Sequence, residues 1–185
     1  MNLVRSAFLL VSACLLGAAV PPLSFTPMEP RFAADTEEYR RIWVDQGGRM
    51  IAALEAAAGV EFPAPPIEAF VSDGPPMMSY DGRTLRLRAG YRTAYKTATL
   101  VHELGHRLAF LLPRSTDLDD HRILYLFLYD AWADLYGRDF ADRMVAIERR
   151  IPGGYDYDAA WTWGLAMTRE ERRERLAELR IAARL

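Results

Sequence analysis

One short pattern constrains this 185-residue chain more than any other: His102, Glu103 and His106 follow the order His-Glu-x-x-His. Residues 92–112 predict one helix, which ends before Pro113. Positions i and i+4 of a helix lie on one face, so both histidines can bind the same metal ion. Glu103 lies beside that face, within reach of a water molecule at the ion. The pattern therefore predicts a metal centre carried by a helix.

The same helix carries an apolar stripe on a different face. Leucines recur at positions 100, 104, 108 and 111, which is the spacing of a buried helix side. Gly105 lowers helix propensity, and close approach of another segment would explain a glycine there. We therefore expect a buried helix with one apolar side and one metal side.

A catalytic zinc site needs a third protein ligand and leaves the fourth position for water. The acidic and histidine side chains after the motif supply the candidates: Asp117, Asp119, Asp120, His121, Asp130 and Asp134. Residues from 119 or 120 to 136 predict the next helix, with Gly137 at its end. On that helix, Asp130 and Asp134 share a face with apolar residues. Burying two carboxylates there requires a cation, hydrogen bonds or a metal-bound histidine.

The motif at residues 102–106, followed after twenty-three residues by Asp130-Ala131-Trp132-Ala133-Asp134, resembles the zincin metallopeptidases. Within them it is similar to the gluzincin, thermolysin-like branch, and most to its minimal members. The resemblance covers residues 84–137. It implies Zn²⁺ on His102, His106 and Asp130, with Glu103 as general base and Asp134 accepting the other ring N–H of His102. The family usually has Glu where this chain has Asp130, so the helices must lie closer. Asp134 and His121 remain alternatives for the third ligand.

Residues 1–20 predict a signal peptide or an anchor. Arg5 is followed by an uncharged run over 7–20, which is typical of an export signal and short for a membrane span. Small residues at 17–19 suit signal peptidase. Val11-Ser12-Ala13-Cys14 resembles a lipobox, so lipid anchoring at Cys14 is an alternative, as is an uncleaved anchor or a buried helix. We expect an exported protein, secreted or periplasmic.

The remaining chain divides into a Pro-rich link over 21–32 and a single domain over 33–185. Helices are predicted over about 34–58, 138–150 and two segments after the break at 152–154, the last starting at a capping box, Thr168 to Glu171. A strand is predicted over 67–71, and a hairpin over 77–88 with an Asp81-Gly82 type I′ turn. Its second arm alternates like a sheet edge. The fold class is α+β and helix-rich, with a small sheet packed on the motif helix.

Composition excludes several functional classes. The net charge of −2 gives no sign of a nucleic-acid partner or an anionic membrane surface. Cys14 is the single cysteine, so an internal disulfide is impossible and a cysteine ligand or nucleophile is excluded from the domain.

These features together predict a zinc-dependent peptidase that acts on a peptide or protein substrate. Tyr155, or else Tyr157, is expected to donate a hydrogen bond to the oxyanion of the reaction. Two other functions stay open: a non-peptidase zinc hydrolase, and a catalytically inactive zinc-binding or interaction protein. The last of these would not need Glu103.

Overall fold

The computed structural model describes residues 20–183. The predicted export segment and Cys14 lie outside the described residues. Among the helices within residues 20–183, none combines the length and the apolar character that a bilayer span requires.

The sheet has four strands in the order β1-β2-β4-β3. Their bounds are Leu23–Pro27 for β1, Ile67–Ser72 for β2, Met77–Met78 for β3 and Thr84–Arg88 for β4. β1, β2 and β4 run parallel, and β3 runs antiparallel to β4. Alternate residues of β2 and β4 are buried, among them Val71, Leu85 and Leu87. This mixed sheet and its covering helices confirm the predicted α+β class.

Three details of the sheet differ from the sequence-based prediction. Residues 21–32 contain β1, which pairs with β2 as an edge strand; edge positions tolerate proline, so flanking prolines do not exclude a strand. β4 is an interior strand, and β3 is the edge. The Asp81-Gly82 turn is not type I′, because Gly82 has a φ of 67° but Asp81 does not have a positive φ. Asp81 instead accepts hydrogen bonds from Ser79 and Arg83.

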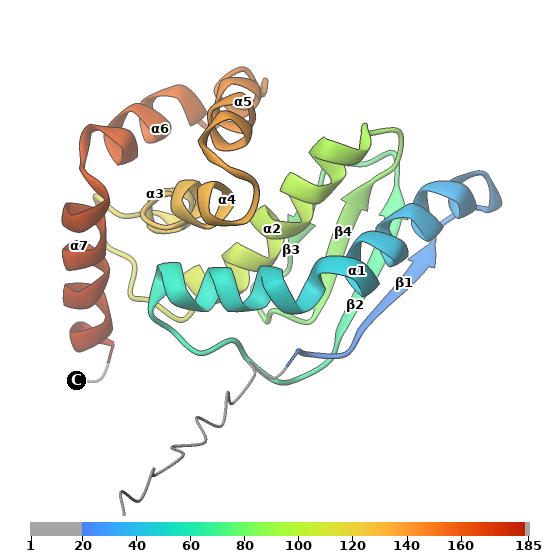
Figure 1. The fold of residues 1–185 in the computed structure, drawn as a ribbon, viewed down its shortest axis with the longest axis horizontal. Coiled ribbons are helices and arrows are strands. Elements are labelled where there is room, and N and C mark those ends of the chain that lie inside the picture. The colour runs from blue at the N-terminus through green and yellow to red at the C-terminus, as the bar shows by residue number, and fades with distance from the viewer. Residues whose placement is uncertain (1–19, 184–185) are drawn as a thin grey trace, which may run out of the picture.

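Helices make up most of the remaining chain (Figure 1). Their bounds are Pro30–Phe32 for the short 3-10 turn η1, Ala33–Ala58 for α1, Thr93–Ala109 for α2, Asp120–Tyr125 for α3, Leu128–Tyr136 for α4, Arg138–Glu148 for α5, Tyr157–Ala166 for α6 and Arg169–Ala182 for α7. The predicted capping box at the start of α7 is confirmed, with Thr168 and Glu171 exchanging hydrogen bonds. Gly59 ends α1 with a φ of 67°.

The predicted single helix over 119–136 is wrong, because the chain forms two helices, α3 and α4. Phe127 separates them with φ of −137° and ψ of −20°, outside the helical range. No glycine or proline marks this break, and both Leu126 and Phe127 are buried. The chain changes direction between α3 and α4 where these two side chains are buried, and not at a helix-breaking residue. Residues 120–125 and 128–136 therefore do not share one helical face.

α1 and α2 join the sheet to the group formed by α3 to α7, since α1 packs on α4 and α7 (Figure 1). α2 packs on α1, α3, α4, β3 and β4. The predicted close approach at Gly105 is confirmed: a Cβ there would lie 2.6 Å from Leu124 Cδ1 of α3. This contact packs the end of α3 closely against α2, next to the motif histidine His106.

Candidate metal centre

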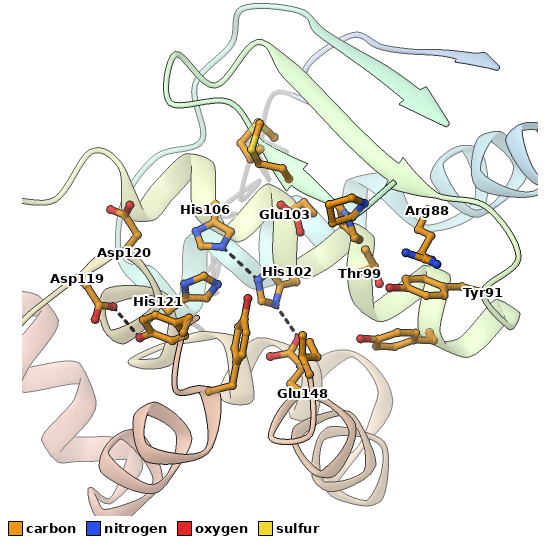
Figure 2. Close-up of a pocket in the computed structure, with 18 of the residues that line it drawn as sticks. Arg88, Tyr91, Thr99, His102, Glu103, His106, Asp119, Asp120, His121 and Glu148 are labelled. Atoms are coloured by element: carbon orange, nitrogen blue, oxygen red, sulfur yellow. Dashed lines mark hydrogen bonds and ion pairs between the residues drawn. The ribbon is translucent and has the colours of Figure 1, made fainter. Parts of the chain in front are cut away.

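Three histidines from two helices meet at the centre of the molecule. His102 and His106 lie one turn apart on α2, and His121 lies in the first turn of α3. One ring nitrogen from each falls in a group whose members all lie within 4.8 Å of one another. Figure 2 shows the three rings turned toward one another. Asp119 fixes the start of α3 by accepting a hydrogen bond from the backbone N–H of Arg122.

The geometry of this group fits a metal ion. The Nε2 atoms of His102 and His106 are 3.2 Å apart. Two nitrogens bound tetrahedrally to one zinc ion lie about 3.3 Å apart, given a Zn–N distance of about 2.0–2.1 Å. Within the described residues, His106 Nδ1 is buried without a hydrogen-bond partner. Residues 20–183 thus contain a three-histidine group that could hold a metal ion.

Glu148, the last residue of α5, orients His102. Its Oε1 lies 2.7 Å from His102 Nδ1. The other oxygen accepts from Tyr125 Oη at 3.1 Å and from Trp161 Nε1 at 3.0 Å. A carboxylate at Nδ1 keeps the proton on that nitrogen, so that in the neutral ring the Nε2 lone pair is directed at the group. α3, α5 and α6 therefore cooperate in holding one histidine ring.

The charges around the site act differently on the three histidines. Burial alone would lower the pKa of His102, but the charge and hydrogen bond of Glu148 outweigh it and raise the pKa to about 8. Burial lowers the pKa of His121 to about 4 and that of His106 well below its usual value, and the neighbouring histidines add to both effects. His106 and His121 are therefore neutral at physiological pH, which is the form that binds metals.

Glu103 lies beside the histidine group with one oxygen unused. The side chain is buried, and within the described chain its Oε2 has no hydrogen-bond partner. Burial raises its pKa to about 7, opposed by the charge of His102 and by a hydrogen bond from the backbone of Met78 in β3. An unsatisfied buried carboxylate oxygen is costly, so its retention beside the group indicates a chemical role.

These side chains open into a cavity of about 690 Å³. Its walls come from β3, α2, α3 and the segment before α6 (Figure 2). The lining residues beyond the histidines and glutamates include Met77, Met78, Tyr80, Arg88, Tyr91, Tyr95, Thr99, Phe110, Asp119, Asp120, Tyr155 and Tyr157. The site is therefore reachable by a molecule considerably larger than water.

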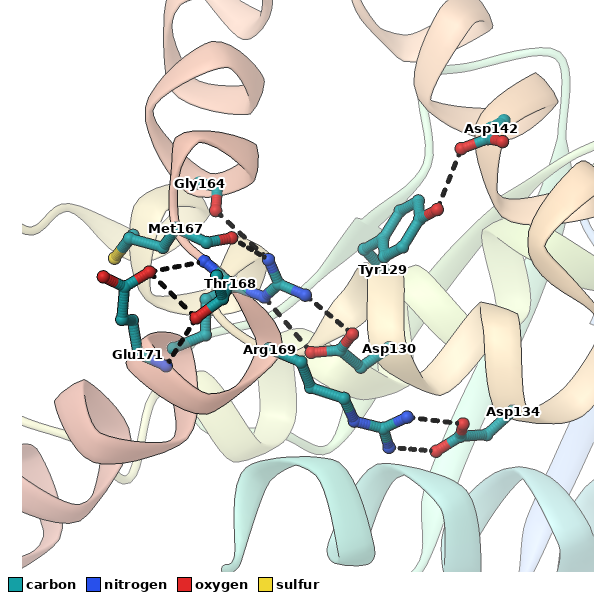
Figure 3. A network of polar contacts seen from close by, with 10 residues as sticks. Tyr129, Asp130, Asp134, Asp142, Gly164, Met167, Thr168, Arg169 and Glu171 are labelled. Carbon is teal, nitrogen blue, oxygen red and sulfur yellow. Dashed lines mark hydrogen bonds and ion pairs between the residues drawn. The ribbon is translucent and has the colours of Figure 1, made fainter.

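The structure does not bring Asp130 into this group. Both of its oxygens accept from Arg172 of α7, at 2.7 Å from Nη2 and 3.1 Å from Nε. Arg172 also donates to the carbonyl of Met167 between α6 and α7. Figure 3 shows Asp130 within this network of polar contacts between α4 and α7. The cation that the buried Asp130 carboxylate requires is thus an arginine. His121, and not Asp130, is the third member of the histidine group, although the family resemblance implied Asp130 as the third ligand.

The other two predicted residues also have partners of their own. Asp134 forms an exposed ion pair with Arg169 (Figure 3), while the carboxylate beside His102 Nδ1 is Glu148. Tyr155 lines the cavity, packs its ring 4.6 Å from that of His121 and donates its hydroxyl to Asp119 at 2.8 Å. Tyr157 lines the same cavity.

The sequence analysis does not predict Glu148 as a partner of His102, although the sequence contains one sign that Glu148 is buried. It continues the buried stripe of α5 that contains Ala141, Met144 and Val145. A glutamate on such a stripe needs a buried partner. The stripe alone does not say which partner, because His102 lies forty-six residues away.

No family model, no curated protein and no solved structure matches this chain. The metal centre therefore rests on the geometry of His102, His106 and His121 together with Glu103.

Proposed function

We propose that this protein is a zinc-dependent peptidase in which His102, His106 and His121 hold the ion and Glu103 is the general base. The observation that carries the proposal is the buried, unpaired Oε2 of Glu103 next to the three imidazoles in an open cavity. The His-Glu-x-x-His order and the resemblance to zincins support the same conclusion.

Zinc is the metal that this donor set favours. Three imidazole ligands with an open fourth position are typical of catalytic zinc, and His102 would lose its second proton when the metal binds. When bound, zinc would lower the pKa of a water molecule and polarise the carbonyl to be cleaved. The site described here supplies the ligands and the path for a substrate to reach them.

Each protein group then has a separate task. Glu103 accepts a proton from the attacking water and delivers it to the departing amine nitrogen. Glu148 keeps the His102 ring oriented and its Nδ1 protonated. The hydroxyls of Tyr155 and Tyr157 line the cavity and are the candidates for donors to the developing oxyanion, but that of Tyr155 must first leave Asp119.

A peptide substrate is favoured by the strand above the site. β3 pairs on one side with β4 and forms the sheet edge on the other. Its residues Met77 and Met78 line the cavity. An edge strand can pair with an extended chain, which is how many peptides bind, and in β3 the backbone of Met78 already uses one such group to donate to Glu103. We also propose export to the cell exterior or periplasm, from the charge and hydropathy of residues 1–20.

The test compares the wild-type protein with Glu103→Gln for zinc content and cleavage of casein. We expect about one zinc per chain in both proteins and at least a hundredfold lower cleavage in the variant, since general base catalysis contributes about 10²–10⁴-fold. Thermal melting curves check that both are folded. Zinc binding by the wild type without any hydrolysis would refute the peptidase and leave a zinc-binding protein. Absence of zinc from the wild type would refute the metal centre.

A further inference from the structure

The cavity has one end whose chemistry the hydrolysis does not use. Arg88, at the end of β4, is the single arginine or lysine among the lining residues, which all belong to the described chain. Its side chain is exposed, and within residues 20–183 no carboxylate lies within ion-pair distance of its guanidinium. The guanidinium N–H donors are thus available to a ligand.

A hydrogen bond to its backbone carbonyl and a pair of packed tyrosines fix the place of this arginine. Tyr39 donates its hydroxyl to the carbonyl of Arg88 at 2.9 Å. The guanidinium lies over the ring of Tyr91, 5.9 Å from its centre, and Tyr95 packs against Tyr91 at 4.4 Å. Cation–π contact holds the guanidinium over a ring face and leaves the N–H edge free for a planar anion such as a carboxylate.

The opposite end of the cavity has the opposite charge. Asp119 and Asp120 lie there, while Arg88 and Tyr91 lie on the far side of His102 (Figure 2). Asp120 is paired with Arg114, and Asp119 accepts from Tyr155. Arg114 offsets one of the two aspartates, so the end with Arg88 is the one that attracts an anionic group on a bound molecule.

The distance along α2 sets the spacing. Tyr95, Thr99 and His102 follow one another on the cavity side of this helix. Tyr95 precedes His102 by seven residues, which is roughly 10 Å along a helix axis. An extended peptide covers that distance in about three residues.

We propose that Arg88, with Tyr91 and Tyr95, forms a carboxylate-binding subsite that makes the protein prefer peptides with an anionic group about three residues from the bond to be cleaved. The cleavage part of this statement rests on the proposed peptidase function. The carboxylate can be a Glu or Asp side chain or the free C-terminus of a peptide. Both present the same planar group to the guanidinium.

The test measures binding separately from cleavage, in the Glu103→Gln background with and without zinc. The probes are fluorescein-labelled octapeptides of alanine and leucine that carry one Glu or one Gln at each successive position, with amidated C-termini. The Gln series is also made with a free C-terminus, which distinguishes the two sources of carboxylate. Fluorescence anisotropy gives each dissociation constant.

We expect the best Glu or free-carboxylate peptide to bind about 10- to 100-fold more tightly than its neutral partner, as is typical of charge-assisted hydrogen bonds. Arg88→Gln should reduce that ratio to nearly one. Arg92→Gln is the matched control, because Arg92 is an exposed arginine nearby that does not line the cavity; it should keep the ratio. Melting curves of both variants check the fold.

Equal ratios in Arg88→Gln and Arg92→Gln would overturn the subsite, as would a failure of every peptide to bind. Cleavage by the wild type without preference for an anion would also overturn it, while the peptidase would stand. Binding preference that depends on Arg88 in a protein that cleaves nothing would support the subsite and refute the peptidase.

Discussion

Two buried carboxylates, Glu148 and Asp130, lie in similar surroundings and have different partners. Each is at most 5% exposed, and each stands on the inner side of a short helix. Glu148 faces His102 of the metal centre, whereas Asp130 faces Arg172 of α7. Burial therefore indicates that a carboxylate needs a partner, but it does not indicate whether that partner serves catalysis or the stability of the fold.

The largest effect is expected when Asp130 loses its charge. Asp130→Asn should lower the free energy of unfolding by about 3–5 kcal/mol, because Arg172 would stay buried without its anion. Urea denaturation in the presence of a chelator measures this loss. Zinc affinity of the folded variant should match the wild type, since among the described residues Asp130 accepts only from Arg172.

His121→Ala is expected to have the opposite pattern of effects to Asp130→Asn. It should abolish tight zinc binding while changing the free energy of unfolding of the metal-free protein much less than Asp130→Asn does. The reverse pattern, with zinc lost in Asp130→Asn and kept in His121→Ala, would show that Asp130 is the third ligand after all.

The second effect tests the other carboxylate. Glu148→Gln keeps the shape of the side chain but removes the charge beside His102 Nδ1. Zinc affinity should fall about 10- to 100-fold, which is the usual loss when such an orienting partner is changed. Competition with a chromophoric chelator measures the affinity. An affinity within twofold of wild type would mean that Glu148, like Asp130, serves only the fold.

The smallest effect is expected at Asp134. Its ion pair with Arg169 is exposed, with 42% and 44% of the two side chains accessible. Asp134→Asn should therefore change the free energy of unfolding by at most about 1 kcal/mol and leave zinc affinity unchanged. Urea denaturation measures the first quantity, and competition with a chromophoric chelator measures the second. A clear loss of zinc affinity would restore Asp134 as the partner of His102.

What the sequence could predict depended on how local each feature is. The motif face of α2 follows from spacing within one turn, and the stop of α1 at Gly59 follows from a single residue. The stop predicted at Pro113 is wrong, because α2 already ends at Ala109, before the proline. The third histidine and Glu148 depend on how α3 and α5 pack against α2. Such contacts have no local signature.

The break at Leu126 and Phe127 removes the single long helix on which Asp130 and Asp134 were expected to lie. A continuous helix from residue 119 to 136 would have carried Asp130 as part of one face, and only a glycine or proline would have argued against it. The chain instead breaks at two buried apolar residues. Neither residue is a helix breaker, so local propensity gave no warning.

The contact between Gly105 and Leu124 bears on how closely two of the three histidines approach each other. Gly105 adjoins His106, and Leu124 stands one turn after His121, so the missing methyl group determines how far apart those two imidazoles are held. An alanine at position 105 would act as a spacer between the helices. A residue without a side chain thus keeps α2 and α3 close enough for His106 and His121 to belong to one group.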